Sequence, residues 1–288
     1  MRYLDKRRVV LNMQLAAAHL TGTEPPPSAE LKQEFIAGLN DVQSTSIRSI
    51  KDDLYWEFDN PGLVNLLVEK TVFSLAEVSG GVHLLPDNER KQVIHNLEAA
   101  KALLADADPN LYYLLTQLVG SVAIYQIPYR DGGSVSCCIG LIWLSPHKDW
   151  QVDYYAEMLV HEFVHNSVFL EDMVRGIMPN PTLLDRDEAL SISAIRQTRR
   201  PYDKAFHSAC VAAAIMYYYH CSGDVKKAET YIVPLQRTVA DLSEADGALR
   251  AQGLDLLTDN GREIVEELRR FIVHGPDYSV IANALATH

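Results

Sequence analysis

The residues best suited to chemistry lie in one short segment, where His161 and His165 enclose Glu162 in the spacing H-E-x-x-H. Positions four apart on an α-helix differ by only about 40° around the axis, so the two imidazoles project from one face. One divalent metal ion can bind both rings, with the carboxylate of Glu162 beside it. The segment therefore predicts a metal site.

The surroundings of this pair favour a metal over two unrelated histidines. The pair lies in an uninterrupted apolar run from about residue 153 to residue 174, which predicts a helix. Neighbours such as Leu159, Val160 and Phe163 predict that the pair is buried. Because buried imidazoles need partners, a metal ion is the expected one.

Two histidines do not complete a metal site, and the third ligand decides the class of enzyme. The metzincin pattern requires Gly at 168 and His at 171, where this chain has Val168 and Glu171, so that class is excluded. A gluzincin-like site takes a glutamate from a second helix downstream, and Glu188 has a suitable spacing. The other candidate is His207, near the start of a later apolar run.

Three arginines, Arg196, Arg199 and Arg200, stand shortly before His207 in a chain that is otherwise acidic. A guanidinium group binds a carboxylate through two parallel, charge-assisted hydrogen bonds. An oxygenase that uses 2-oxoglutarate needs such a cation for the far carboxylate of this cosubstrate. It also needs Fe(II) on three protein ligands, with positions left open for the keto acid and O2. The alternative interpretation of the arginines is a solvated loop.

The order of these features resembles a known family. After the H-E-x-x-H segment come Ser193-x-x-Arg196, then Arg200-Pro201, then His207 at the head of a helix of small residues. Together with a β-rich run that ends at Ser145, this combination is similar to the HExxH-motif enzymes found with peptide natural-product gene clusters. Those enzymes are described as iron- and 2-oxoglutarate-dependent peptide β-hydroxylases. The resemblance covers about residues 135–220.

The resemblance implies a dioxygenase that uses Fe(II), O2 and 2-oxoglutarate to hydroxylate an unactivated carbon, the β-carbon, of a peptide or amino-acid-like substrate. His207 then joins the two motif histidines as third metal ligand. Arg200 is the anchor for 2-oxoglutarate, with Arg196 second. Glu162 stands beside the ligands or is itself a ligand.

Two other functions fit the same motif. In a zinc metallopeptidase, Glu162 is the general base and the third ligand is Glu188 or His207. In a binding protein without catalysis, the metal site is structural or vestigial. The three hypotheses differ in which metal is bound and in what the loss of Glu162 does.

Composition excludes some partners. The 288 residues carry a formal net charge of -12, which argues against broad binding to nucleic acid or to an anionic membrane surface. No apolar run has the length of a membrane-spanning helix. The four cysteines form no disulfide framework, and the basic start of the chain is interrupted by polar residues, so we expect a cytoplasmic protein.

The elements that position these residues predict an α+β fold, predominantly helical, with a small β-sheet before the metal-binding helix. We expect a helical N-terminal region over residues 1–119 and a metal-binding catalytic region over 120–288, or one continuous domain. Residues 121–128 and 134–145 read as strands that could pair as a hairpin around Asp131-Gly132-Gly133. The second strand either completes the sheet or offers its edge to an extended peptide.

Overall fold

The structure, a computed structural model, describes residues 1–27 and 29–275. It is mostly helical with a small mixed sheet, which confirms the predicted α+β class. The chain forms two compact units. Val10–Leu170 is called here the sheet unit, and Met1–Val9 with Glu171–His288 the helical unit. This division does not coincide with the boundary expected after residue 119, because a strand from the first region pairs with one from the second.

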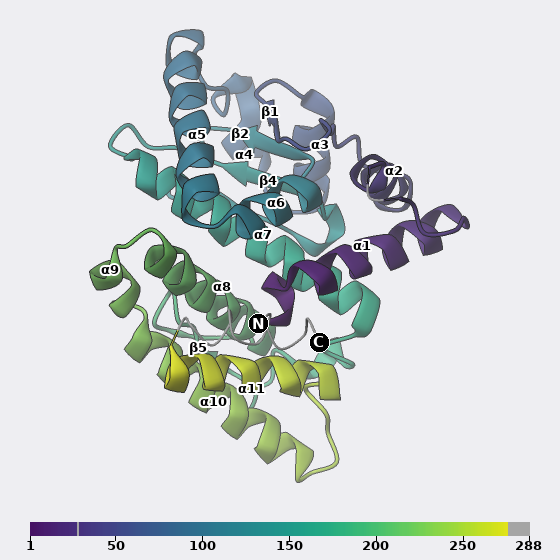
Figure 1. The fold of residues 1–288 in the computed structure, drawn as a ribbon, viewed down its shortest axis with the longest axis vertical. Coiled ribbons are helices and arrows are strands. Elements are labelled where there is room, and N and C mark those ends of the chain that lie inside the picture. The colour runs from purple at the N-terminus through teal and green to yellow at the C-terminus, as the bar shows by residue number, and fades with distance from the viewer. Residues whose placement is uncertain (28, 276–288) are drawn as a thin grey trace. The chain divides into compact units, whose positions relative to one another are not determined.

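The sheet unit is built on a four-stranded sheet in the order β1-β2-β4-β3. Strands β1, β2 and β4 are parallel, and β3 is antiparallel to β4. They lie among the helices α3, α5, α6 and α7 (Figure 1). The strand bounds are β1 Tyr55–Glu57, β2 Ser121–Ile124, β3 Gly132–Gly133 and β4 Leu141–Leu144.

The hairpin expected from residues 121–128 and 134–145 is wrong, since β2 and β4 run parallel with Ser121 opposite Leu141. Only the two residues of β3 turn back along β4. The chain then passes through a short 3-10 helix and re-enters the sheet after Gly140, whose φ is 92°. This left-handed backbone conformation favours glycine, which has no Cβ to strain it. Consequently β4 is an inner strand, and the edge beside it belongs to β3.

The helices of the sheet unit follow the apolar periodicity of the sequence. Their bounds are α2 Leu31–Gln43, α3 Pro61–Glu69, α4 Leu75–Val78, α5 Asp87–Ala107 and α6 Pro109–Leu118, with the 3-10 turns η2 Ser79–Gly81 and η3 Ser136–Cys138. Two further helices, α1 Lys6–Thr21 and α7 Val152–Arg175, each continue from one unit into the other.

Over residues 171–275, the helical unit contains four helices after α7 and a two-stranded antiparallel sheet. Helix α8 is buried along most of its length. The bounds are α8 Tyr202–Cys221, α9 Val225–Glu229, α10 Ile232–Arg250, α11 Asp259–His274, β5 Ser191–Ile192 and β6 Arg199–Arg200, with the 3-10 turns η1 Arg2–Leu4 and η4 Pro181–Leu183.

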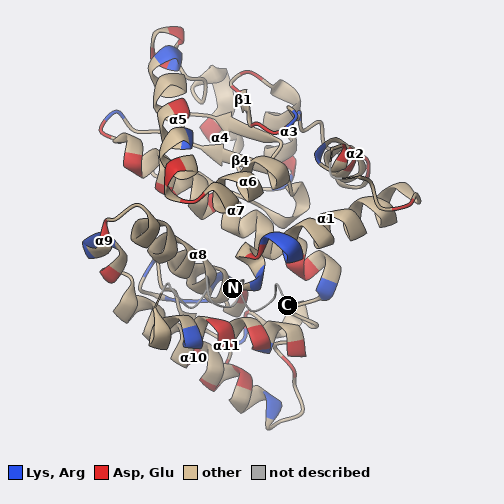
Figure 2. Ribbon diagram, in the orientation of Figure 1, with Lys and Arg blue, Asp and Glu red and all other residues tan. Residues whose placement is uncertain are grey.

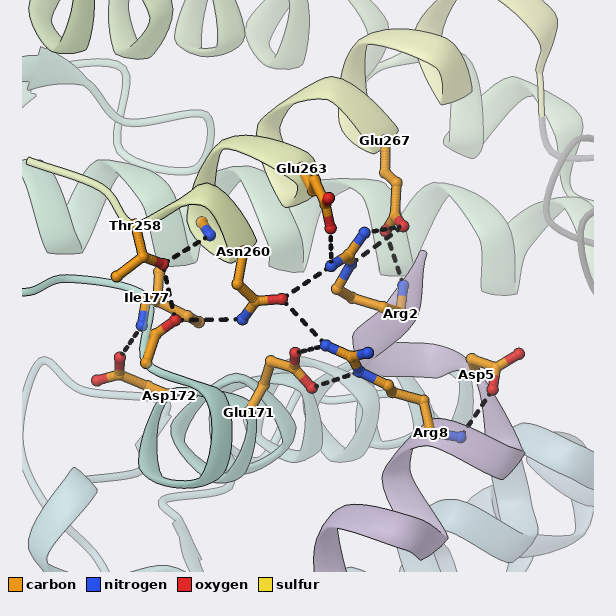
Figure 3. Close-up of polar contacts among 12 residues, drawn as sticks. Arg2, Asp5, Arg8, Glu171, Asp172, Ile177, Thr258, Asn260, Glu263 and Glu267 are labelled. Atoms are coloured by element: carbon orange, nitrogen blue, oxygen red, sulfur yellow. Dashed lines mark hydrogen bonds and ion pairs between the residues drawn. The ribbon is translucent and has the colours of Figure 1, made fainter.

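The first residues of the chain are fixed in the helical unit by two arginines (Figure 3). The guanidinium of Arg2 donates to Glu267 and, at 2.8 Å, to Asn260 Oδ1. Arg8 donates to both carboxylate oxygens of Glu171, at 2.6 and 3.2 Å. Asn260 joins the two, because its Oδ1 also accepts from Arg8 at 3.0 Å. This N-terminal clamp uses only charged and amide groups that pair within one unit.

Charged side chains of both signs lie along α10 and α11 of the helical unit. Figure 2 shows Lys and Arg interspersed with Asp and Glu along α10 and α11. Within residues 1–27 and 29–275, none of the helices combines the length and apolar character that crossing a membrane requires.

Candidate metal centre

Helix α7 places His161 and His165 on one face, as the four-residue spacing predicts. Their ring centroids are 5.2 Å apart, and the ring of Phe169, one turn further, stacks on His165 at 6.2 Å. Their apolar neighbours are buried, but both histidines are only half-buried, with 20% of the His161 side chain exposed. The expected burial of the pair is therefore only partial.

Glu162 is buried, with 3% of its side chain exposed. Its Oε2 accepts a 2.8 Å hydrogen bond from Ser134 Oγ, and its Oε1 lies 3.9 Å from His161 Nε2. Burial raises the pKa of Glu162 to about 8, and the hydrogen bond from Ser134 opposes that rise. In the described part of the chain, no Lys or Arg pairs with this carboxylate. A buried carboxyl without a cation beside two imidazoles fits a divalent metal, whose charge favours the ionised form.

Two residues that the sequence did not single out support this carboxylate. Asn166, fully buried one residue after His165, accepts from the backbone N–H of Gly140 at 2.8 Å. Its Nδ2 donates to Ser134 Oγ at 3.2 Å and to the carbonyl of Glu162 at 3.1 Å. An amide in an otherwise apolar helical run was the available signal, because a buried amide needs partners.

The predicted third ligand, His207, lies in the first turns of α8 in the helical unit. It is half-buried, and loss of water around the ring lowers its pKa to about 4. The imidazole is therefore neutral at pH 7, which is the form that binds a metal. The hydroxyl of the next residue, Ser208, accepts from the backbone N–H of Ala194 at 2.9 Å and so ties α8 to the preceding loop.

The arginines before α8 differ in how they are held. Arg196 is exposed in a turn that is closed by Ser193, whose hydroxyl accepts from the Arg196 N–H at 3.1 Å. Arg199 is exposed, and its guanidinium donates to the carbonyl of Leu190 at 2.8 Å. Arg200 is half-buried in β6, paired with β5 directly before α8. Arg199 and Arg200 are both paired in β6, and of the two only Arg200 is half-buried.

Glu188, the alternative third ligand, lies exposed in a turn. The gluzincin-like arrangement takes its glutamate from a helix, and none forms between η4 and α8. An exposed turn holds a side chain loosely, which makes Glu188 a poorer metal ligand than a half-buried imidazole on a helix. This difference favours His207.

The sheet unit brings the motif residues together, whereas His207, Arg196 and Arg200 belong to the helical unit. Among the residues that the structure describes, no group of three or more His, Cys, Asp or Glu side chains could hold a metal ion. The third ligand therefore stays a prediction. The chain matches no model of a known protein family, and comparison with curated proteins finds no match.

Proposed function

We propose that the protein is a non-heme oxygenase that depends on Fe(II) and 2-oxoglutarate and hydroxylates an unactivated carbon, the β-carbon, of a peptide or amino-acid-like substrate. The observation that carries the proposal is the character of the available ligands. His161 and His165 share one face of α7. The alternative third ligand, Glu188, lies in an exposed turn, so the favoured third ligand is His207, whose imidazole is neutral. The resemblance of residues 135–220 to peptide β-hydroxylases supports the same class.

In this proposal His161, His165 and His207 bind the metal as neutral ligands. These ligands add no negative charge of their own, so the double positive charge of the metal would attract the dianionic keto acid. When bound, Fe(II) activates O2, so that one oxygen atom enters the C–H bond and the other enters the succinate formed from 2-oxoglutarate with loss of CO2. Glu162, beside the imidazole of His161, adds negative charge next to the metal.

Arg200 anchors the far carboxylate of 2-oxoglutarate in this proposal, with Arg196 as the second group. The strand pairing of β6 fixes the backbone of Arg200 opposite Ser191. The neighbouring guanidinium of Arg199 is already bound to a backbone carbonyl. Arg199 therefore provides a matched control of the same charge, one residue away.

Anaerobic addition of Fe(II) and 2-oxoglutarate tests the proposal. A chelate of the keto acid on Fe(II) gives a weak visible charge-transfer band, and we expect this band in the wild type. Arg200→Ala should weaken 2-oxoglutarate binding by roughly 10- to 100-fold, the loss expected for a charge-assisted bidentate contact. Arg199→Ala should leave it unchanged. Absence of the band, with zinc-dependent peptide cleavage instead, contradicts the proposal.

A zinc metallopeptidase is the second candidate, and the position of Glu162 favours it. Its Oε1 lies 3.9 Å from the ring nitrogen of His161 that would face a metal, which is where a general base acts on metal-bound water. Glu162→Gln separates the two activities. It abolishes hydrolysis by a peptidase while the metal stays bound, whereas in the oxygenase the loss is partial.

The proposal includes the cellular compartment in which the enzyme acts. All four cysteines are free thiols, including the adjacent pair Cys137 and Cys138, as expected in a reducing compartment. We propose a cytoplasmic enzyme that acts on a peptide. Localisation of a tagged chain by fractionation tests this directly.

A further inference from the structure

Ser134 reaches Glu162 because the preceding strand, β3, lies unusually close to β4. Gly133 is the last residue of β3, directly before Ser134, and it lies opposite Trp143 of β4. A Cβ at Gly133 would lie 2.7 Å from the indole ring, and one at Gly132 would lie 2.8 Å from the carbonyl oxygen of Trp143. Real side chains do not approach this closely, so only glycines allow β3 to lie here. The next residue, Ser134, then reaches the buried carboxylate of α7.

A chain of hydrogen bonds runs from the sheet to that carboxylate in one direction. The N–H of Gly140, at the start of β4, donates to Asn166 Oδ1 at 2.8 Å. Asn166 Nδ2 donates to Ser134 Oγ at 3.2 Å, and Ser134 Oγ donates to Glu162 Oε2 at 2.8 Å. The serine hydroxyl has a second acceptor, the carbonyl oxygen of Glu162 at 3.2 Å, but its shorter contact is the one to the carboxylate. Successive donors polarise one another and strengthen the last bond.

This chain fixes the orientation of the carboxylate. With Oε2 held by Ser134, the other oxygen, Oε1, is directed to within 3.9 Å of His161 Nε2. In the described ranges, Ser134 is the one side chain that hydrogen bonds to the carboxylate of Glu162. Loss of this bond therefore frees the carboxylate to rotate within its pocket.

We infer that Ser134 is a positioning residue of the metal centre, held by Asn166, that sets Glu162 beside the metal-binding nitrogen of His161. The inference rests on the metal-binding part of the proposed function and applies to either candidate reaction. Partners of this kind, one step removed from the metal, change its affinity by about 10- to 100-fold. Ser134 touches neither metal nor substrate and acts through Glu162.

Titration of the full-length, metal-free protein with Co(II) tests the inference. The readouts are the dissociation constant and the visible absorption of the bound ion, which reports its coordination. We expect Ser134→Ala to raise the dissociation constant by about 10-fold or more and to change the spectrum. Ser134→Thr keeps the hydroxyl and should restore both. Ser136→Ala, at an exposed serine two residues on, is the matched control and should match the wild type.

A second variant separates positioning from a general effect on folding. In the background of Glu162→Gln, adding Ser134→Ala should change Co(II) affinity no further, because the serine acts through the carboxylate. An equal loss in both backgrounds overturns the inference, as does a wild-type spectrum in Ser134→Ala.

The outcomes also distinguish the inference from the proposed function. Dependence of Co(II) affinity on Ser134 without a 2-oxoglutarate band supports the positioning role and rejects the oxygenase. A band in the wild type together with indifference to Ser134→Ala keeps the oxygenase and rejects the positioning role. A wild-type protein that binds no Co(II) overturns both.

Discussion

Two of the buried glutamates of helix α7, Glu162 and Glu171, have opposite kinds of partner. Glu171 has 1% of its side chain exposed and receives two hydrogen bonds from the guanidinium of Arg8 (Figure 3). Glu162 has 3% exposed and receives one bond, from the neutral hydroxyl of Ser134. The two carboxylates are similarly buried, so the difference lies in the group that faces each one.

This contrast indicates which carboxylate has a role beyond stability. A buried charge costs free energy unless it is paired, and Arg8 compensates the charge of Glu171 within the folded chain. Glu162 has no such compensation and stands beside two imidazoles, an arrangement typical of functional sites. Burial alone therefore does not separate the two carboxylates; under the proposed function, the lack of a protein cation and the neighbouring imidazole distinguish Glu162.

The largest expected effect is on the paired glutamate. Glu171→Gln leaves the guanidinium of Arg8 in the clamp without its anion, and we expect the free energy of unfolding to fall by about 3–5 kcal/mol. Urea denaturation of the metal-free protein measures this. A loss below about 1 kcal/mol, the value typical of an exposed pair, removes the distinction between the two sites.

Lys32 of α2 extends the comparison to a buried cation. Its ammonium donates to the carbonyl oxygen of Asp53, and burial lowers its pKa from 10.5 to about 8. Between these two pH values the unfolded chain binds more protons than the folded one, so the free energy of unfolding rises with pH. The rise is on the order of 2–3 kcal/mol.

Lys32→Met removes this pH dependence. From pH 7.5 to pH 10, we expect the free energy of unfolding of the wild type to rise relative to that of the variant. Urea denaturation at several pH values measures the difference. A difference that stays constant with pH contradicts the account of this lysine.

Gly133→Ala tests the strand contact that serves Glu162. The added Cβ would lie 2.7 Å from the ring of Trp143, and overpacking of this kind costs about 1–3 kcal/mol. Gly247 in α10, where a Cβ meets nothing within 4 Å, is the control. Its change to alanine should be neutral or stabilising by about 0.5–1 kcal/mol. Thermal unfolding of the two variants compares them, and equal effects would show that β3 has room to move.

The smallest effect is expected at Glu162, the glutamate to which the proposed function gives a role. Burial raises the pKa of Glu162 to about 8, so in the metal-free protein at neutral pH Glu162→Gln replaces a largely protonated carboxyl that has no cation beside it, and the amide oxygen can still accept from Ser134. We expect the metal-free variant to be as stable as the wild type, or more stable by about 1 kcal/mol, as found when functional groups are replaced. The same urea experiment as for Glu171→Gln applies. A loss as large as that of Glu171→Gln assigns Glu162 a structural role.

Local patterns predicted α7, its histidine pair and the fold class, because periodicity and spacing act within a few residues. They did not predict the parallel pairing of β2 and β4, since a Gly-Gly turn between two β-rich runs is also typical of a hairpin. The sequence also did not predict the partners of the two glutamates, Ser134 for Glu162 and Arg8 for Glu171. They lie 28 and 163 residues away in the chain, and only the folded chain brings them together.

The most direct test of the account is the metal content of the histidine pair. Anaerobic calorimetric titration with Fe(II) should show one ion bound per wild-type chain and no comparable binding after His161→Ala. His95→Ala, at an exposed histidine of α5, should bind as the wild type does. Fe(II) binding that is unchanged by His161→Ala would contradict the assignment of α7 as the metal-binding helix.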